Sequence, residues 1–537
     1  GGSVNFTTAD YLRLGDGARF TATPGTQDIA ISSAPVAAFG FLGSNPGAIT
    51  VQGGHLGVAE GQGLSLVGGN IDIRSGLLEN GSSQSARLSA PAGQINLVSA
   101  GSTGEVTTTN AVAPSSNPAF QGVTSLGSIS LTQGTVMTAS AQSAGRIVIR
   151  SGQFTMQDAR LEAGTTGTLP NTASPIPVGE AISIQADHIS LSQGAQILTS
   201  AIDGTAGNIA LEVGTLRSNI GTDGNSFIGV APVTIASSST GQGGPGSIFI
   251  HGKAGAPADS ILLSNTRIVT EVSHNAAPSA VPGNIDLTAQ QVELVNGTAL
   301  RAGTTGGADA GAITLNLDTL KTQAGPDGRV SISSDSNCGG QCVGGQAGYI
   351  TIQGIPGVTP PSTRLYRHVT TPDSEPNRAI TYYFSSDFDI KGTDIHSDAI
   401  GNAPGGIVMM RTNGRASFMD SSVSVTTQDF EINGVKPNGQ PAQNQGFSRI
   451  DVMGRDIVLK DSTIRANADV SDVGSCPLCQ GGPSAGEIWL RAEQSLTADN
   501  SLIANTSRGR AQAGITKIIK DHYFSFGARI LIRRPVQ

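Results

Sequence analysis

Four cysteines are the residues whose type and spacing first suggest chemistry. They form two tight pairs, Cys338 with Cys342 and Cys476 with Cys479. Four thiolates could hold a tetrahedral zinc ion if the pairs met in space. The pairs lie in separate loops of the repeat described below, with three or more coils between them. At about 4.8 Å per coil, the two pairs would be roughly 15 Å or more apart. We therefore expect one local disulfide in each loop, as is typical outside the cytosol, with separate metal or redox roles and free thiols as alternatives.

An acidic run is the second place where chemistry could occur. It contains Asp387, Asp389, Asp394, His396 and Asp398. An enzyme acting on polysaccharides needs two or three carboxylates that converge, often with Arg, Lys or His. Alternation places Asp389 and Asp394 on an outer face, but no adjacent segment supplies evident partners. We interpret the run as a solvated polar face and expect no catalytic residue.

The remaining motifs give no support for a bound metal or cofactor. No two of the 7 histidines have a metal-ligand spacing. Neither a Gly-x-Ser-x-Gly motif nor a calcium-binding loop occurs. The sequence therefore predicts no cofactor and no metal.

A short repeat must position all of these residues. Its clearest copy is GNIDLTAQQVELVNGTALRAG at residues 283–303. Two stretches of alternating character, IDL and VEL, are followed by a turn at Asn296 and Gly297 and then by a third short stretch. Alternation of period two places one set of side chains on one face of a strand. We expect three short strands to close into one coil of a β-solenoid, with the aliphatic residues inward.

The anchor Gly-x-Ile-x-aliphatic recurs along most of the chain and predicts about fourteen coils. Most of the extra length between anchors falls before the next anchor, so we expect the loops mostly at one corner of the coil. Glycine numbers 72 residues and aromatic residues only 4%, which suits the narrow interior of a solenoid. Two inward columns should contain Ile147, Ile149, Ile209, Leu211, Ile285, Leu287, Ile313, Leu315, Ile350, Ile352, Ile488 and Leu490.

Several aromatic residues are candidates for a ligand or partner surface. A large insertion at residues 355–386 is rich in proline and then in tyrosine. Alternation also directs three aromatic side chains away from the interior, where either a partner or a neighbouring loop could cover them. The candidates are Tyr366, Tyr382, Tyr383, Trp489, Phe249 and Tyr349.

The charge and the two ends of the chain suggest further limits. The formal net charge is −8, which disfavours nucleic acid or an anionic membrane as a partner. No apolar run is long enough for a transmembrane helix, and the first residues do not have the form of a signal peptide. Residues 515–537 are basic and apolar and leave the coil pattern. We expect this segment to cap the last coil or to be exchanged as a strand between subunits.

The first part of the chain resembles filamentous haemagglutinin and, more broadly, the secretion domain of two-partner secretion exoproteins of Gram-negative bacteria. The resemblance rests on TADYLRL at 8–14, SNPGAI at 44–49, LVGGNI at 66–71 and APAGQINL at 90–97. The NPNG motif of that family is absent, which implies that the chain starts partway through the secretion domain of a longer precursor. The resemblance implies a right-handed parallel β-helix, export through an outer-membrane partner pore and an adhesive role.

These observations together predict an all-β protein with three parts. Residues 1–110 would be the C-terminal part of a secretion-type domain, residues 111–514 a β-helical rod, and residues 515–537 the cap or exchanged strand. We expect a secreted, non-enzymatic adhesin or fibre component at the surface of a Gram-negative bacterium. Its partners would be the secretion pore, glycans or proteins of a host or neighbouring cell, and further copies of itself joined head to tail. The alternative is a β-helical lyase or hydrolase of polysaccharides.

Overall fold

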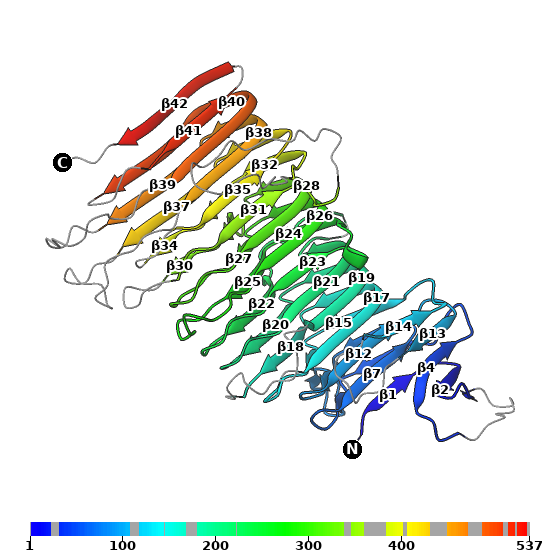
Figure 1. The fold of residues 1–537 in the computed structure, drawn as a ribbon. Helices are drawn as coiled ribbons and strands as arrows, with labels where there is room; N and C mark the ends of the chain where they lie inside the picture. Colours follow the sequence, from blue (N-terminus) through cyan, green and yellow to red (C-terminus); the bar gives the residue numbers. More distant parts are fainter. Residues whose placement is uncertain are drawn as a thin grey trace. The chain divides into compact units, whose positions relative to one another are not determined.

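Strands make up nearly all of the regular structure, as expected for an all-β protein (Figure 1). A 3-10 turn at Lys253–Gly255 is the one helical element among the described residues. The chain divides into two compact units, Gly1–Ile285 and Asp286–Gln537, each considered by itself below. The computed structural model describes residues 2–22, 32–107, 117–143, 145–167, 180–221, 223–337, 345–358, 383–400, 405–429, 448–470, 486–508, 514–520 and 523–533.

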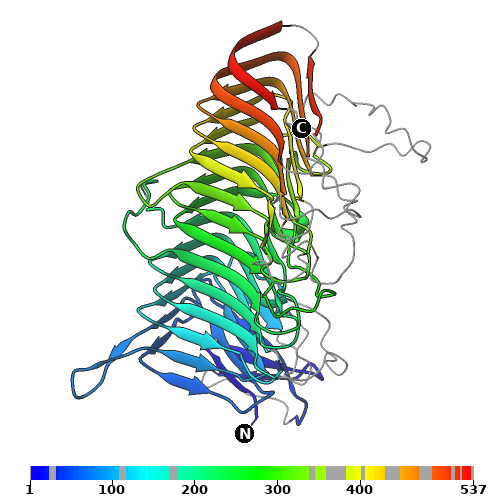
Figure 2. The same ribbon diagram turned by 90° about the vertical axis from the view of Figure 1, so that its left-hand side faces the viewer.

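In unit 1 most strands pair in parallel with strands further along the chain. One ladder contains β7 (Gly63–Gly68), β12 (Gln94–Ser99), β17 (Arg146–Gln157), β19 (Glu180–Ser192), β21 (Asn208–Ser218) and β23 (Ile248–His251). Another contains β16 (Val136–Thr138), β18 (Arg160–Thr165), β20 (Gln196–Ala201), β22 (Val233–Ser239) and β25 (Thr266–Glu271). From β16 to β23, a partner lies two places away in the sequence. Figure 2 shows the strands of each ladder lying side by side.

The register of these strands stacks aliphatic side chains in columns. Ile147 lies beside Ile182, which lies beside Ile209, and Ile209 lies beside Ile248. All four side chains are buried. The column that contains Ile149 and Leu211 is formed in the same way. The predicted inward columns are therefore confirmed in this unit. Successive side chains of a strand alternate between its two faces, so residues paired across strands lie on the same face.

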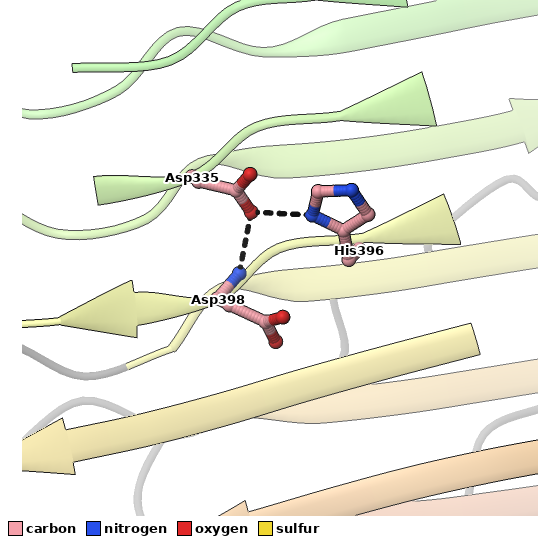
Figure 3. A group of neighbouring side chains, drawn as sticks. All are labelled: Asp335, His396 and Asp398. Carbon is pink, nitrogen blue, oxygen red and sulfur yellow. Dashed lines mark hydrogen bonds and ion pairs between the residues drawn. The ribbon is translucent and has the colours of Figure 1, made fainter. Parts of the chain in front are cut away.

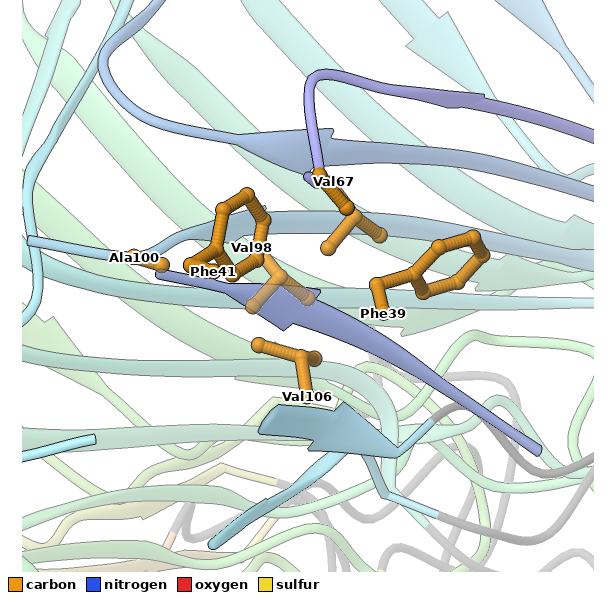
Figure 4. Packing of buried hydrophobic residues seen from close by; sticks show 7 residues of the cluster. Phe39, Phe41, Val67, Val98, Ala100 and Val106 are labelled. Carbon is orange, nitrogen blue, oxygen red and sulfur yellow. The ribbon is translucent and has the colours of Figure 1, made fainter. Parts of the chain in front are cut away.

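An antiparallel sheet lies on the outer side of the first ladder, and the sequence did not reveal it as a sheet. Its strands are, in spatial order, β14 (Ala119–Gln121), β13 (Gly104–Thr107), β4 (Val36–Phe41), β2 (Tyr11–Leu14) and β3 (Arg19–Thr21). Phe39, Phe41 and Val106 of this sheet pack against Val67 and Val98 of the ladder (Figure 4). Val67 and Val98 follow inward leucines, so they face outward, and apolar residues there need a cover.

Unit 2 repeats the parallel arrangement. Its strands include β28 (Ile313–Gln323), β31 (Tyr349–Gln353), β35 (Ile407–Arg411), β38 (Arg449–Lys460) and β40 (Glu487–Arg508), each beside the next. The predicted core residues Ile313 and Ile350 lie beside each other and continue through Val408 and Ile450 to Ile488. All five side chains are fully buried. The neighbouring column of Leu315, Ile352 and Leu490 is equally buried, which confirms the expectation for this unit.

The repeat at residues 283–303 differs from the expectation in one respect. It forms two strands, β26 (Ile285–Val295) and β27 (Ala299–Arg301), and not three. The expected turn is present, because Asn296 and Gly297 both adopt the left-handed conformation with φ of 53° and 79°. The expected corner between IDL and VEL lies inside β26, where no residue has a positive φ, and it does not end the strand.

Close stacking of backbones explains the glycine that opens several of the anchors. A Cβ atom on Gly246 would lie 2.3 Å from the carbonyl oxygen of Gly207. In unit 2, a Cβ atom on Gly348 would lie 1.9 Å from the carbonyl oxygen of Gly311. Neither Gly246 nor Gly348 has a positive φ, so the requirement here is space and not conformational freedom.

The described part of residues 515–537 continues the ladder, contrary to the expected break in the pattern. Strands β41 (Thr516–Lys520) and β42 (Tyr523–Arg533) both pair in parallel with β40. Basic side chains are compatible with this pairing because the hydrogen bonds come from the backbone. A capping or exchanging role for this segment, and the domain boundaries at residues 110 and 514, stay predictions.

Candidate functional site

Asp335, His396 and Asp398 come together on neighbouring rungs of unit 2, where a rung is one layer of the stacked parallel strands (Figure 3). His396 is the last residue of β33 (Thr393–His396), and Asp398 follows it before β34 (Ala399–Ile400). Asp335 lies between β29 (Val330–Ser333) and β30 (Ser336–Asn337). Strand β29 pairs with β33 and β30 pairs with β34, so the register places Asp335 beside Asp398.

Serine residues next to the two aspartates set the direction of the carboxylates. Ser334 and Ser397 are fully buried. The Ser334 hydroxyl donates to the carbonyl of Gly311 at 2.5 Å, and the Ser397 hydroxyl donates to the carbonyl of Gly348 at 2.7 Å. With each serine bonded inside the coil, the following aspartate points to the other side. Both aspartate side chains are partly accessible to solvent as a result.

The three side chains form one connected group. Oδ1 of Asp335 accepts hydrogen bonds from Nδ1 of His396 and from the backbone N–H of Asp398, both at 2.9 Å. The Asp398 carboxylate accepts from the backbone N–H of Thr426 at 2.6 Å and from the Ser424 hydroxyl at 3.1 Å. One ligand atom of each of Asp335, His396 and Asp398 lies within 4.8 Å of the others. Such convergence is a property of binding sites for protons or cations.

Burial and neighbouring charges shift the pKa values of His396 and Asp398. Burial lowers the pKa of the His396 imidazole, but the hydrogen bond and charge of Asp335 and the charges of Asp398 and Asp394 outweigh it, so the pKa is raised. Burial raises the pKa of Asp398, and the charge of Asp335 raises it further. The charge of His396 and hydrogen bonds from Thr426 and Ser424 oppose this increase without cancelling it. The group therefore favours a bound positive charge.

The other members of the acidic run are held elsewhere. Asp394 receives two hydrogen bonds from the Arg329 guanidinium, at 2.9 and 3.1 Å, and the same guanidinium also donates to Asp420 at 2.8 Å. Asp389 forms an ion pair with Lys391 at 2.8 Å. The interpretation of a solvated polar face therefore fits these residues, whereas His396 and Asp398 are partly exposed members of the connected group with Asp335.

Asp335 was missed because it lies far from His396 and Asp398 in the sequence. The missed signal is a match between two segments, SISSDS at 331–336 and DIHSDA at 394–399, which both carry Ser-Asp after an isoleucine strand. Aligning these segments would have placed Asp335 beside Asp398.

The outward aromatic residues have different environments. Trp489 is only 8% exposed, and cationic groups of Arg449, Arg491 and Lys517 each lie 4.5 Å from its ring centroid. Cation–π contacts of this kind stabilise packing. Trp489 is thus covered and is not an open partner surface, and the described cations that cover it come from its own strand and from the adjacent strands β38 and β41. Tyr349, by contrast, is 51% exposed, as predicted.

The other candidates are half-buried or lie outside the described residues. Phe249 and Tyr383 are half-buried. Most of the expected insertion lies outside the described residues, including Tyr366 and Tyr382. All four cysteines, Cys338, Cys342, Cys476 and Cys479, lie outside them too, so their expected pairing stays a prediction.

Comparisons with known proteins do not assign the chain to a group. Within the described part of the chain, no helix has the length and apolar character needed to cross a membrane. No family model, no curated protein and no solved structure matches this sequence or its fold.

Proposed function

We propose that this chain is a secreted, non-enzymatic adhesin or fibre component at the surface of a Gram-negative bacterium, exported through an outer-membrane partner pore. The observation that carries the proposal is the stacking of parallel strands around buried aliphatic columns in each unit. Repeated coils of this kind offer long faces and loops for contact with a partner. The resemblance to two-partner secretion exoproteins supplies the route of export and the adhesive role.

The proposal includes a right-handed β-helix of about fourteen coils with three sides in each coil, two of which can be formed by one continuous strand, and loops mostly at one corner. Three successive strands of unit 2 support the three-sided coil. Strands β31, β32 (Asp387–Lys391) and β33 pair in order with β35, β36 (Arg415–Met419) and β37 (Ser422–Asp429). Each side of one coil thus has its own partner in the next.

Head-to-tail association is part of the proposal. Val4 and Phe6 of β1 (Val4–Thr7) lie beside the buried Leu64 and Leu66 of β7 and so extend an inward column. They are 38% and 42% exposed. Exposed apolar side chains of this kind favour contact with a further chain. Contact with host or neighbouring-cell glycans and proteins would use the loops and outer faces.

Two measurements test this function. Fluorescently labelled full-length chain should bind saturably to glycans or to cells, and sedimentation velocity should show species larger than one chain as concentration increases. A heat-unfolded sample is the control for adhesion through exposed apolar surface. Absence of saturable binding to any glycan or cell type, together with a monomer at all concentrations, would contradict the proposal.

The second candidate function, a polysaccharide lyase or hydrolase, has one specific observation in its favour. Asp335 and Asp398 are neighbouring carboxylates, and the raised pKa of Asp398 is typical of a general acid. One oxygen of each carboxylate lies within 4.8 Å of the other. This separation is close to the distance of about 5–5.5 Å between the two carboxyl groups of retaining glycosidases. Release of reducing ends or unsaturated sugars from a polysaccharide panel, abolished by Asp398→Asn, would establish this candidate in place of the adhesin.

A further inference from the structure

We propose that Asp335, His396 and Asp398 bind one Zn²⁺ ion that links two neighbouring rungs of unit 2. The sequence predicted no metal, because the ligands are brought together only by the pairing of β29 with β33 and of β30 with β34. The proposal is independent of the adhesive function. It concerns the residues of this group and not the cysteines.

The distances suit a small cation. Zinc bonds of about 2.0–2.2 Å place tetrahedral ligand atoms roughly 3.3 Å apart. Nδ1 of His396 lies 2.9 Å from Oδ1 of Asp335, and all three ligand atoms lie within 4.8 Å of one another. Small rotations of the carboxylates would equalise these separations without moving the backbone.

The types of ligand distinguish zinc from the common oxygen-seeking cations. An imidazole nitrogen is a good ligand for zinc, whereas Ca²⁺ takes about 6–8 oxygen ligands and Mg²⁺ prefers oxygen and retains water. Three protein ligands leave one position of a tetrahedral ion for water. Asp394 is not a fourth ligand, because both its oxygens accept hydrogen bonds from Arg329.

The surroundings orient the proposed ligands and leave them accessible. The Asp398 N–H holds Asp335, and Ser424 and Thr426 hold Asp398. Such outer hydrogen bonds fix ligand direction in metal sites. The side chains of His396 and Asp335 are 30% and 27% exposed, so an ion can reach them from solvent. For an ion to bind Nδ1 of His396, the proton that Nδ1 donates to Asp335 must leave this nitrogen, to Nε2 of the neutral ring or to water from the charged ring.

The test is a zinc titration of chelator-treated full-length chain by isothermal calorimetry, with thermal unfolding as a second readout. The wild type should bind one more equivalent than Asp335→Asn or His396→Ala, and zinc should raise its unfolding temperature by an amount that these variants lose. The matched control is His188→Ala, since His188 is exposed, lies in unit 1 and forms a hydrogen bond with the hydroxyl of Thr215. It should retain the full stoichiometry. Ser424→Ala should weaken binding by about 10–100-fold.

The four cysteines are common to all these proteins, so the difference between variants isolates the proposed site. Cobalt substitution provides a further check, because this site should add d–d absorption without a thiolate charge-transfer band. Circular dichroism of the metal-free variants establishes that they are folded. If His396→Ala does not fold, the isosteric Asp335→Asn decides the question. Equal zinc stoichiometry in the wild type and Asp335→Asn, or no binding to the wild type, would overturn the proposal.

Discussion

Replacing Gly246 with alanine should destabilise unit 1 through the backbone and not through the core. The new Cβ atom would lie 2.3 Å from the carbonyl oxygen of Gly207 and 2.7 Å from that of Ala206. Cβ atoms in proteins essentially never come closer than 3.0 Å to such an atom. The two rungs must therefore separate by about 0.7 Å at this point.

This displacement sets the size of the effect. Next to the contact, the Ile209 N–H donates to the carbonyl of Ser247 at 2.9 Å. Lengthening this bond by the same amount gives about 3.6 Å, which is beyond hydrogen-bond range. The Gly246 N–H also donates to the Ser237 hydroxyl at 2.7 Å and would be displaced with it. Loss of two or three such bonds at about 1 kcal/mol each predicts a cost of about 2–3 kcal/mol.

Urea unfolding followed by circular dichroism measures this cost, and hydrogen exchange of peptides from β21 and β23 locates it. The control is Gly204→Ala, because a Cβ atom on Gly204 meets nothing within 4 Å. Its stability should be unchanged or slightly higher, since alanine restricts the unfolded chain more than glycine does. If both variants unfolded at the same urea concentration, with equal exchange in β21 and β23, close stacking would not be the reason for the anchor glycine.

Three other predictions concern the core, the outer face and the N-terminal sheet. Ile350→Asp should cost more than about 4 kcal/mol, because it buries an unpaired charge, and Tyr349→Asp at an exposed position is the control in the same unfolding assay. Trp489→Ala should cost about 1.5–3 kcal/mol in the same assay, from three cation–π contacts of about 0.5–1 kcal/mol each, and a loss no larger than that of Trp489→Phe would contradict it. In the wild type, the fluorescence of the single tryptophan reports the unfolding of this region. Burial raises the pKa of Glu105, but hydrogen bonds from Arg13 and Tyr11 and neighbouring arginine charges outweigh it and lower the pKa below 4.5. This contribution to stability is full above pH 4.5 and is lost as the pH falls through the lowered value, so thermal unfolding between pH 7 and 3 should depend less on pH in Glu105→Gln, and an unchanged dependence would refute the assignment.

The parallel core was accessible from the sequence because its signal is local. A strand of period two shows its inward residues within a few positions, as at Ile285 and Leu287, and both are buried. The turn at Asn296 and Gly297 was equally local, because a sharp corner requires residues that tolerate a positive φ. Local patterns did not reveal where one strand ended, since the first bend of β26 needs no special residue.

The tertiary structure decided which side chains from different strands pack against one another. The antiparallel sheet packs on Val67 and Val98, two apolar residues at outward positions where the repeat usually has polar ones. Only the structure shows that Phe39 and Phe41 cover them. The cover over Trp489 comes from residues of its own and neighbouring rungs, whose identity depends on register.

The group at Asp335, His396 and Asp398 shows the same division between sequence and structure. The sequence by itself determined that His396 and Asp398 follow one strand and that Asp335 follows another. Only the parallel pairing of those strands decided that the three side chains meet. The insertion at residues 355–386 separates Asp335 from His396 and Asp398 in the sequence, and its length does not indicate which strands pair. Alternation determines the face of a side chain, whereas the hydrogen-bonded register between rungs determines its neighbours, and chemistry depends on the neighbours.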